Sequence, residues 1–301
     1  MRSYALIVNP ASGRGRGIRR ADLLRTGLGG AGSVELLTTT RRGEATELAC
    51  EAARRVDRII AIGGDGTLNE VLNGLIDSGL EPADLPELGF LPAGTANAAG
   101  RAFGSSLSPG AMARALAHAE SIPVDVGIVR HEGGERAFML WFGAGWDAVV
   151  IHTLNAERSG PMGVSGLIRE VPRMLSAISR YRQPRITSKV DGSIFGEHSS
   201  LIIANVGATG FGGTVAPEAE PGDGRFDIVG LPHFTIFGSI RMGVRLFTSS
   251  LIRCQGVSHS LGSRVTLSAA GTVPFHVDGE PVGELPATVT MRLGAIRFLK
   301  P

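Results

Sequence analysis

The regular alternation of short apolar runs with amphipathic stretches, over roughly the first 125 residues, is the feature that most restricts the fold. The strand-like runs read YALIVNP, VELLTT, RIIAIGG and ELGFLPAG, and the helical patterns between them fall near 17–28, 43–56 and 66–78. This order is typical of a parallel sheet with helices on both faces. In such sheets ligands bind beyond the carboxyl ends of the strands. We therefore predict a doubly wound α/β domain with a binding site at that edge.

Three of the four predicted strands end in segments rich in glycine and small polar residues: NPASG at 9–13, GGDGT at 63–67 and PAGTAN at 92–97. Behind GGDGT the apolar residues recur at helical spacing, and Thr67 with Glu70 fits a capping box at the start of that helix. A glycine-rich turn that opens a helix offers backbone N–H groups and a positive dipole end to phosphate. We expect one crevice lined by three phosphate-binding loops.

The second half of the chain has a different pattern. Its short strand-like runs are bounded by turn residues, which predicts an antiparallel β-sandwich. The runs read RAFMLWFGAG, RITSKVDGSIFG, SSLIIANVGA, RFDIVGL, RVTLSAA and ATVTMRL. Two stretches near 164–181 and 234–252 have helical periodicity, with arginines beside an apolar stripe. Because no low-complexity linker separates the halves, we expect the active site in a cleft between two touching domains.

Composition restricts the chemistry. All but two of the 30 Lys and Arg residues are arginines, and the exceptions, Lys189 and Lys300, lie far from every glycine-rich loop. A Walker P-loop and a protein-kinase lysine are therefore excluded. Cys50 and Cys254 have no partner at metal-ligand spacing, which argues against structural zinc and fits a reducing compartment. With no signal peptide and no long uncharged apolar run, the expected location is the cytoplasm, with any membrane contact peripheral.

Asp65 lies inside the GGDGT segment, where a loop that binds phosphate should avoid negative charge. A carboxylate beside a bound triphosphate is explained if it holds Mg²⁺, directly or through water. The alternative is an aspartate that caps the following helix. The surrounding glycines favour the metal role. Gly63, Gly64, Gly66, Thr67, Leu68 and Asn69 complete the segment expected to contact the phosphates.

The order of several motifs resembles the diacylglycerol kinase catalytic domain family of lipid kinases, which includes sphingosine and ceramide kinases. The motifs are NPASG, GGDGTLNEV, LPAGTANA, VDVG, GWDAVV, ANVGATGFGG, APEAEPGDGRFDIV and HVDGEPVGELP. GGDGT alone is shared with NAD kinases, but the series extends through essentially the whole chain. The resemblance implies a nucleotide-binding α/β domain at 1–127 and a β-sandwich lipid-acceptor domain at 128–290. It also implies a last strand, at 291–301, that returns to the first domain.

The resemblance extends to the site residues. It implies nucleotide contacts at Asn9, Pro10, Ala11, Ser12, Gly13, Thr39 and Thr95, with ATP as phosphoryl donor and Mg²⁺ as cofactor. Thr38 and Thr40 flank Thr39, so that register is open by one residue. Taken singly, each of the loops also fits an ordinary strand-to-helix turn.

The HVDGE motif implies a catalytic role for Asp278 and Glu280, beside Asp65. A lipid hydroxyl is a poor nucleophile, and a carboxylate within hydrogen-bond reach can accept its proton. Glu280 is the expected proton acceptor, with Asp278 orienting it or linked to metal. A type I′ hairpin turn built on Asp278-Gly279 is the alternative.

Metal ligands are implied at two further places. Asp223 would give its carboxylate to a second, structural magnesium site, with backbone carbonyls from Glu220 and Arg225. Asp125 resembles an acid that links through water to the GGDGT aspartate. An Asp-Gly turn and a strand-end cap are the respective alternatives.

Ala98 departs from the pattern, because many bacterial members carry an acid at that position. The favoured function is an ATP-dependent lipid kinase, with diacylglycerol as the first acceptor and a sphingoid or other lipid as the alternative. A soluble kinase of the NAD kinase type and an inactive nucleotide- or lipid-binding regulator stay open. The expected partners are a lipid substrate and a membrane surface, not nucleic acid, and an oligomer is not excluded.

Overall fold

The computed structural model describes residues 2–13, 15–30, 32–94, 97–105, 108–149, 151, 183–208, 213–233 and 235–300. It divides into two compact units, Met1–Asp125 with Leu293–Pro301 (unit 1) and Val126–Arg292 (unit 2). The predicted helix at 164–181 and the predicted nucleotide contact Thr95 lie outside the described residues.

Unit 1 is built on a parallel sheet with the strand order β2-β1-β3-β4-β16. Its strands are β1 (Arg2–Val8), β2 (Gly32–Thr38), β3 (Arg58–Gly63) and β4 (Glu87–Pro92), joined by the end of β16 (Ala287–Lys300), where Phe298 pairs with Leu88. The central strand β3 is buried along its whole length. A strand covered on both faces has no need of polar alternation, which explains its run of isoleucines.

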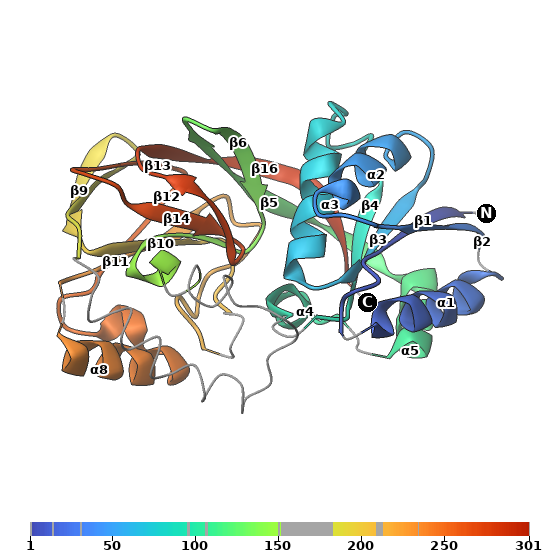
Figure 1. Ribbon diagram of the computed structural model, residues 1–301, viewed down its shortest axis with the longest axis horizontal. Helices are drawn as coiled ribbons and strands as arrows, with labels where there is room; N and C mark the ends of the chain where they lie inside the picture. Colours follow the sequence, from blue (N-terminus) through green and yellow to red (C-terminus); the bar gives the residue numbers. More distant parts are fainter. Residues whose placement is uncertain are drawn as a thin grey trace. The chain divides into compact units, whose positions relative to one another are not determined.

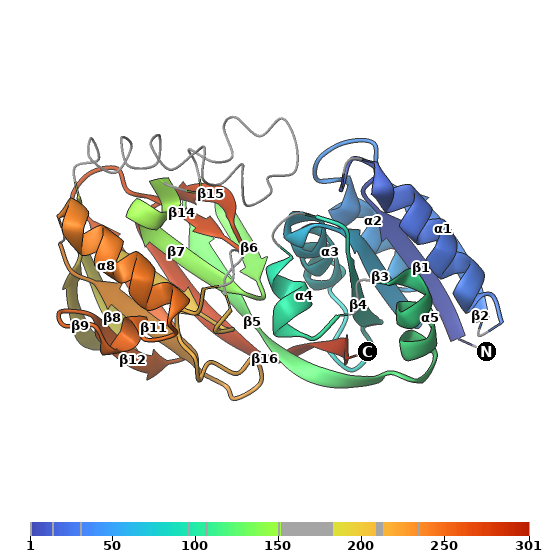
Figure 2. The ribbon, with the colours of Figure 1, turned by 90° about the horizontal axis from the view of Figure 1, so that it is seen from below.

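The helices cover both faces of this sheet (Figure 1). They are α1 (Arg16–Leu28), α2 (Glu44–Ala52), α3 (Asp65–Asp77), the short α4 (Ala98–Ala102) and α5 (Pro109–His118). α1 and α5 share one core cluster with β1, β3 and β4, through residues such as Leu24, Leu28 and Leu116. α2 and α3 pack on the other face (Figure 2). The predicted doubly wound fold is confirmed.

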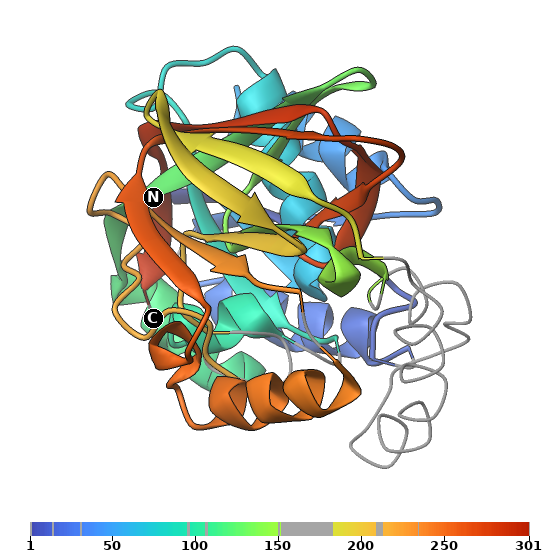
Figure 3. The ribbon, with the colours of Figure 1, turned by 90° about the vertical axis from the view of Figure 1, so that its left-hand side faces the viewer.

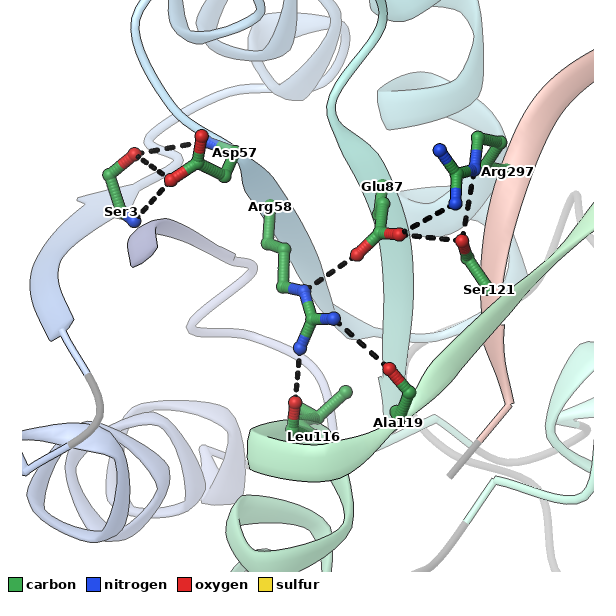
Figure 4. A network of polar contacts seen from close by, with 8 residues as sticks. All are labelled: Ser3, Asp57, Arg58, Glu87, Leu116, Ala119, Ser121 and Arg297. Carbon is green, nitrogen blue, oxygen red and sulfur yellow. Dashed lines mark hydrogen bonds and ion pairs between the residues drawn. The ribbon is translucent and has the colours of Figure 1, made fainter. Parts of the chain in front are cut away.

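A buried arginine joins the helices of unit 1 to its sheet. Arg58 is 1% exposed; its Nε donates to Glu87 Oε2 at 2.7 Å and its Nη2 to the carbonyl of Ala119 at 3.1 Å. Ser121 Oγ donates to the other oxygen of Glu87 at 2.5 Å, and the Arg297 guanidinium lies 3.3 Å from that same oxygen (Figure 4). Since burial is offset by these donors and charges, the pKa of Glu87 lies below its ordinary value. The network ties together β3, β4, β5 (Glu120–His131) and β16.

Unit 2 is a sandwich of two sheets, as predicted. In one sheet β16 pairs with β13 (Arg264–Ala269), followed by β8 (Ile186–Val190) and β9 (Ser193–His198), and β5 (Glu120–His131) pairs with both β16 and β6 (Gly134–Phe138). The other has the order β12-β11-β10-β7-β14-β15. Its strands are β7 (Trp141–Gly145), β10 (Ser200–Ala204), β11 (Phe226–Leu231), β12 (Ser258–Gly262), β14 (Pro274–Val277) and β15 (Glu280–Glu284).

Phenylalanines and branched side chains from both sheets form the core between them, with Phe138 stacked on Phe226 and Phe142 against Phe275. The outer face of the second sheet is covered by α8 (Ile236–Phe247) and the 3₁₀ helix Leu251–Arg253. Figure 3 shows α8 lying along the sandwich. Met242 and Leu246 on α8 pack on Ile202 and Val229 of that sheet.

No helix within the described ranges is long and apolar enough to cross a bilayer.

Candidate active site

The three loops predicted to bind phosphate meet at the carboxyl edge of the unit 1 sheet. The amides of Ala93 and Gly94 donate to the carbonyl of Gly63, at 2.6 and 3.1 Å, and Asn9 N donates to Ile62 O at 3.0 Å. A Cβ added to Gly94 would lie 2.6 Å from Gly64 Cα, a distance that real side chains do not tolerate. The glycines therefore let the second and third loops approach backbone to backbone.

The first loop is held by its own side chains. Asn9 Oδ1 accepts from Ala11 N at 3.0 Å, and Arg16 Nε donates to the carbonyl of Gly13 at 2.8 Å. Gly13 has φ +63°, and a Cβ there would lie 2.4 Å from the carbonyl oxygen of Ala93. Asn9 Nδ2 lies 3.4 Å from Thr67 Oγ1, which links the first loop to the second.

The predicted capping box at Thr67 and Glu70 is wrong. Helix α3 starts three residues earlier than the box requires, at Asp65, with Gly64 as an extended N-cap and no side-chain cap. Thr67 is then the third helical residue, and Glu70 accepts from Ala45 N on α2 at 3.3 Å. The helix can begin before Thr67 because Gly63 leaves room for the Thr67 side chain, whose Oγ1 would lie 2.4 Å from a Cβ added at Gly63.

The start of α3 leaves backbone amides that donate no bond to the helix's own carbonyls. The first intrahelical bond runs from Leu68 N to Gly64 O, at 3.2 Å, so the amides of Gly66 and Thr67 have no partner within α3. Leu68 is 3% exposed and Asn69 1%, and Asn73 Nδ2 donates to Asn69 Oδ1 at 3.2 Å. The side chains of these two residues thus serve the interior of unit 1.

Asp65 caps a helix, but not its own. Its two carboxylate oxygens accept from Ala98 N and Ala99 N, the first residues of α4, at 3.1 and 3.0 Å. Burial raises the pKa of the Asp65 carboxyl, against the opposing effects of these amides and of the Arg101 charge. Ala98 is fully buried.

The carboxylate oxygens of Asp65 are suitable ligands for a magnesium ion that binds together with a nucleotide. Mg²⁺ keeps several waters and takes one or two carboxylates together with phosphate oxygens. Each Asp65 oxygen that accepts one amide has a further lone pair for a cation. Across the described part of the chain no three acidic, His or Cys side chains gather as a metal-binding group. The remaining ligands would therefore have to come from phosphate and water.

A pocket of about 260 Å³ lies next to these loops in unit 1. Its lining consists of Asn9, Pro10, Ala11, Thr39, Thr40, Arg41, Arg42, Ala45, Thr67 and Glu70. Thr39, the predicted threonine ligand, is 7% exposed, and its Oγ1 lies 3.3 Å from the carbonyl of Val8. Sequence reasoning missed Arg41 and Arg42, although they lie in the loop just after β2, the neighbour of β1 in the parallel sheet. Arg41 pairs with Glu47 at the pocket rim.

The other predicted metal ligands make contacts within the protein. Asp125 is 4% exposed, and its Oδ1 accepts from Gly294 N at 2.7 Å, which joins β5 to β16. The carbonyl of Glu220 accepts from Gly222 N at 2.8 Å. Asp223 accepts from Arg225 N at 3.0 Å and lies 3.7 Å from its guanidinium. The segment 220–225 is thus a closed turn, and the second magnesium site stays a prediction.

In unit 2, Asp278 and Gly279 form the turn of the β14–β15 hairpin. Both have positive φ, +51° and +82°, and Val277 pairs with Glu280, which is the type I′ geometry. The Asp278 carboxylate is buried and accepts from the amides of Met139, Leu140 and Trp141, at 2.9 to 3.1 Å. These three hydrogen bonds hold the turn of the hairpin against the residues that lead into β7. Glu280 follows at the first position of β15 and is half-buried.

Comparison with known proteins gives this geometry its context. Residues 3–129 match the model of the diacylglycerol kinase catalytic domain, and residues 142–300 match that of the YegS C-terminal NAD kinase beta sandwich-like domain. The diacylglycerol kinase of Bacillus subtilis is 28% identical over 291 residues, which cover 95% of this chain and 92% of the relative. A protein of Cronobacter sakazakii named "Probable lipid kinase YegS-like" is 28% identical over 280 residues, covering 89% and 86%.

A solved chain from Bacillus anthracis strain Sterne shows the same fold, with a TM-score of 0.80 at 24% identity, over 100% of this chain and 97% of that one. The two domain models together account for nearly all of the sequence, and the second alone covers more than half of it. The chain therefore belongs to the diacylglycerol kinase catalytic domain family, in the form that continues into a YegS-type sandwich domain, and it is a lipid kinase that transfers a phosphoryl group to a hydroxyl.

Proposed function

We propose that this protein transfers the γ-phosphoryl group of ATP, bound with Mg²⁺, to the hydroxyl group of diacylglycerol. The observation that carries the proposal is the convergence of three strand-end loops on the start of α3, beside a pocket that contains two arginines. The phosphate-binding loops support the choice of a nucleotide donor, and the name of the Bacillus subtilis relative, diacylglycerol kinase, supports the choice of acceptor.

In unit 1 the amides of Gly66 and Thr67 at the helix start would bind phosphate oxygens. Arg41 and Arg42 line the pocket and would offset the charge of the nucleotide, the role that lysine takes in a Walker loop. Asp65 would hold the magnesium ion through the lone pairs that its bonds to α4 leave available. Bound Mg²⁺ would neutralise charge on the transferring phosphoryl group.

In unit 2 Glu280 would accept the proton of the lipid hydroxyl. As that proton leaves, the hydroxyl oxygen forms a bond to the γ-phosphorus, the bond between this phosphorus and the bridging oxygen breaks, and ADP departs. Asp278 would orient the hairpin rather than take the proton, because its carboxylate already accepts three amides. A half-buried carboxylate at a strand start is a suitable base for such positioned proton transfer.

A lipid substrate also calls for contact with a membrane, and α8 offers a suitable surface. Val244 and Phe247 are 58% and 60% exposed on the side of the helix opposite Met242 and Leu246. The exposed Arg241 and Arg245 lie on the same helix, which has no acidic residue. Apolar side chains flanked by arginines suit a bilayer with anionic headgroups. We expect Val244→Ser with Phe247→Ser to reduce sedimentation with phosphatidylglycerol vesicles, and Ile194→Ser, which removes an exposed side chain of β9, to leave it unchanged.

The test of the proposed activity is ATP consumption by the purified protein with Mg²⁺ across five acceptors. Diacylglycerol, sphingosine, ceramide and phosphatidylglycerol are offered in mixed micelles, and NAD in buffer. Turnover on diacylglycerol that is lost in Asp65→Asn but kept in Asp77→Asn, at the other end of α3, supports the proposal. Turnover on sphingosine alone would reassign the acceptor, and turnover on NAD alone would overturn the lipid assignment.

A further inference from the structure

A second polar cluster lies buried on the second sheet of unit 2, on the face opposite the core, since the neighbours Phe275 and Val277 of His276 point into that core. His276 on β14 is 1% exposed, and its Nε2 lies 3.3 Å from Oδ2 of Asp147, just beyond β7. Ser200 Oγ, at the start of β10, lies 2.9 Å from the other oxygen of Asp147. Because an ionised carboxylate only accepts, we assign the imidazole proton to Nε2. The cluster thus joins three neighbouring strands of the second sheet through one carboxylate.

Gly143 makes room for this pair. It lies directly opposite His276 in the β7–β14 ladder. A Cβ added there would lie 2.0 Å from Asp147 Oδ2 and 2.5 Å from His276 Nε2. Only glycine at position 143 therefore leaves space for the His276–Asp147 contact. A buried polar cluster gives little net stability compared with apolar side chains of the same size, which points to a role other than stability.

The position of His276 in the hairpin suggests that role. Phe275 pairs with Gly283 but His276 pairs with Pro281, so β15 carries one extra residue, Val282, at this point. Such a bulge bends a strand and re-aims the side chains beside it. Glu280 follows directly on the turn side of the bulge. The Asp278 carboxylate anchors the turn, and His276 anchors the strand that leads into it.

We propose that His276, held by Asp147, which in turn accepts from Ser200, is a positioning residue that fixes the direction of Glu280. The inference rests on the proposed role of Glu280 as proton acceptor. A misplacement of about 1 Å can cost as much as a hundredfold in rate. His276→Leu should therefore lower kcat by about tenfold to a hundredfold and leave the KM for ATP unchanged, because the nucleotide loops belong to unit 1.

The matched control is a second histidine–aspartate pair in the same sheet. His259 Nε2 lies 2.6 Å from Asp227 Oδ1, between β12 and β11 at the opposite end of the strand order. His259→Leu should keep kcat near that of the wild type. Gly143→Ala, which removes neither partner but crowds the contact, should lower kcat as His276→Leu does. Equal kcat in the His276 and His259 variants would overturn the proposal.

A double-mutant cycle separates positioning from general structural damage. If His276 acts through Glu280, then His276→Leu should cause no further fall in kcat once Glu280→Gln is present. An equal loss in both backgrounds would show that His276 acts elsewhere.

Hydrogen exchange keeps the inference testable if the proposed function fails. In His276→Leu the amides of 278–284 should exchange faster, and in His259→Leu they should not. Unchanged exchange of this segment would overturn the anchor by itself. Faster exchange in a protein whose Glu280→Gln variant keeps full activity would retain the anchor and reject Glu280 as the proton acceptor.

Discussion

At Asp65, burial and hydrogen bonding act on the same carboxylate in opposite directions, and burial has the larger effect on the pKa. A raised pKa means that the folded protein binds this proton more tightly than the unfolded chain does. Its contribution to stability is therefore fully present below the ordinary value of 3.8 and is lost as the pH rises through the folded-state pKa. The proposed function requires the ionised form, since it assigns magnesium to the Asp65 carboxylate. Under that proposal, Asp65 favours binding at some cost to stability.

This balance predicts a pH dependence for Asp65→Asn in the absence of nucleotide. As the pH falls from neutral toward 3.8, the wild type should gain stability relative to the variant, because only the wild type takes up the proton. Urea denaturation of both proteins across that range measures the difference. A difference that is constant, or that shrinks, would contradict the raised pKa.

The first loop allows a test of close approach with an internal control. Gly13 and Gly15 both have left-handed φ, +63° and +82°, but only Gly13 has an atom in the way of a Cβ, the carbonyl oxygen of Ala93. Both alanine variants should pay backbone strain of about 1–2 kcal/mol. Gly13→Ala should lose about 1–3 kcal/mol more through overpacking and bind ATP more weakly. Calorimetry of ATP binding by both variants would measure the difference in affinity. Equal affinity of the two variants would mean that the first and third loops need not touch.

At the scale of the element, the order of strands and helices was readable from the sequence, whereas the contacts that align them were not. The alternation of apolar runs and amphipathic stretches is a local property, so it predicts both domain types. Arg58 reads as the polar start of a strand, yet it is fully buried and bonds to groups 29 to 61 residues away. The predicted capping box is wrong because α3 starts at Asp65. That start depends on space for the Thr67 side chain at Gly63, a contact that the sequence pattern does not show. The partners of Asp65 and His276 lie 33 and 129 residues away in the sequence, so a local pattern could not predict them either.

The buried network of β3, β4 and β5 should be important for stability. Arg58→Met removes the buried guanidinium that pairs with the Glu87 carboxylate and leaves that carboxylate without it. We expect the free energy of unfolding to fall by about 3–5 kcal/mol. Arg297→Met removes a partner that is 52% exposed and should cost at most about 1 kcal/mol. Urea denaturation measures both. Losses of the same size would show that the buried ion pair adds nothing beyond the exposed one.

At the scale of the whole molecule, the two units carry different parts of the proposed chemistry. Unit 1 contains the loops, the pocket and Asp65, and unit 2 contains the hairpin with Asp278 and Glu280. The sequence motifs identified most of these residues, because glycine-rich turns and an Asp-Gly turn are local signals. The motif already favours Glu280 as the proton acceptor, and the structure adds the reason proposed for Asp278's different role, since the Asp278 carboxylate accepts three amides.

The most direct test of the account is the rate of diacylglycerol phosphorylation by Glu280→Gln, measured beside ATP binding and beside Glu284→Gln at the exposed end of the same strand. We expect Glu280→Gln to bind ATP as the wild type does and to lose about 10²- to 10⁴-fold in kcat, the usual contribution of a positioned base, while Glu284→Gln stays active. A Glu280→Gln variant that turns over diacylglycerol at the wild-type rate would contradict the assignment of the proton acceptor, and with it the proposed division of chemistry between the two units.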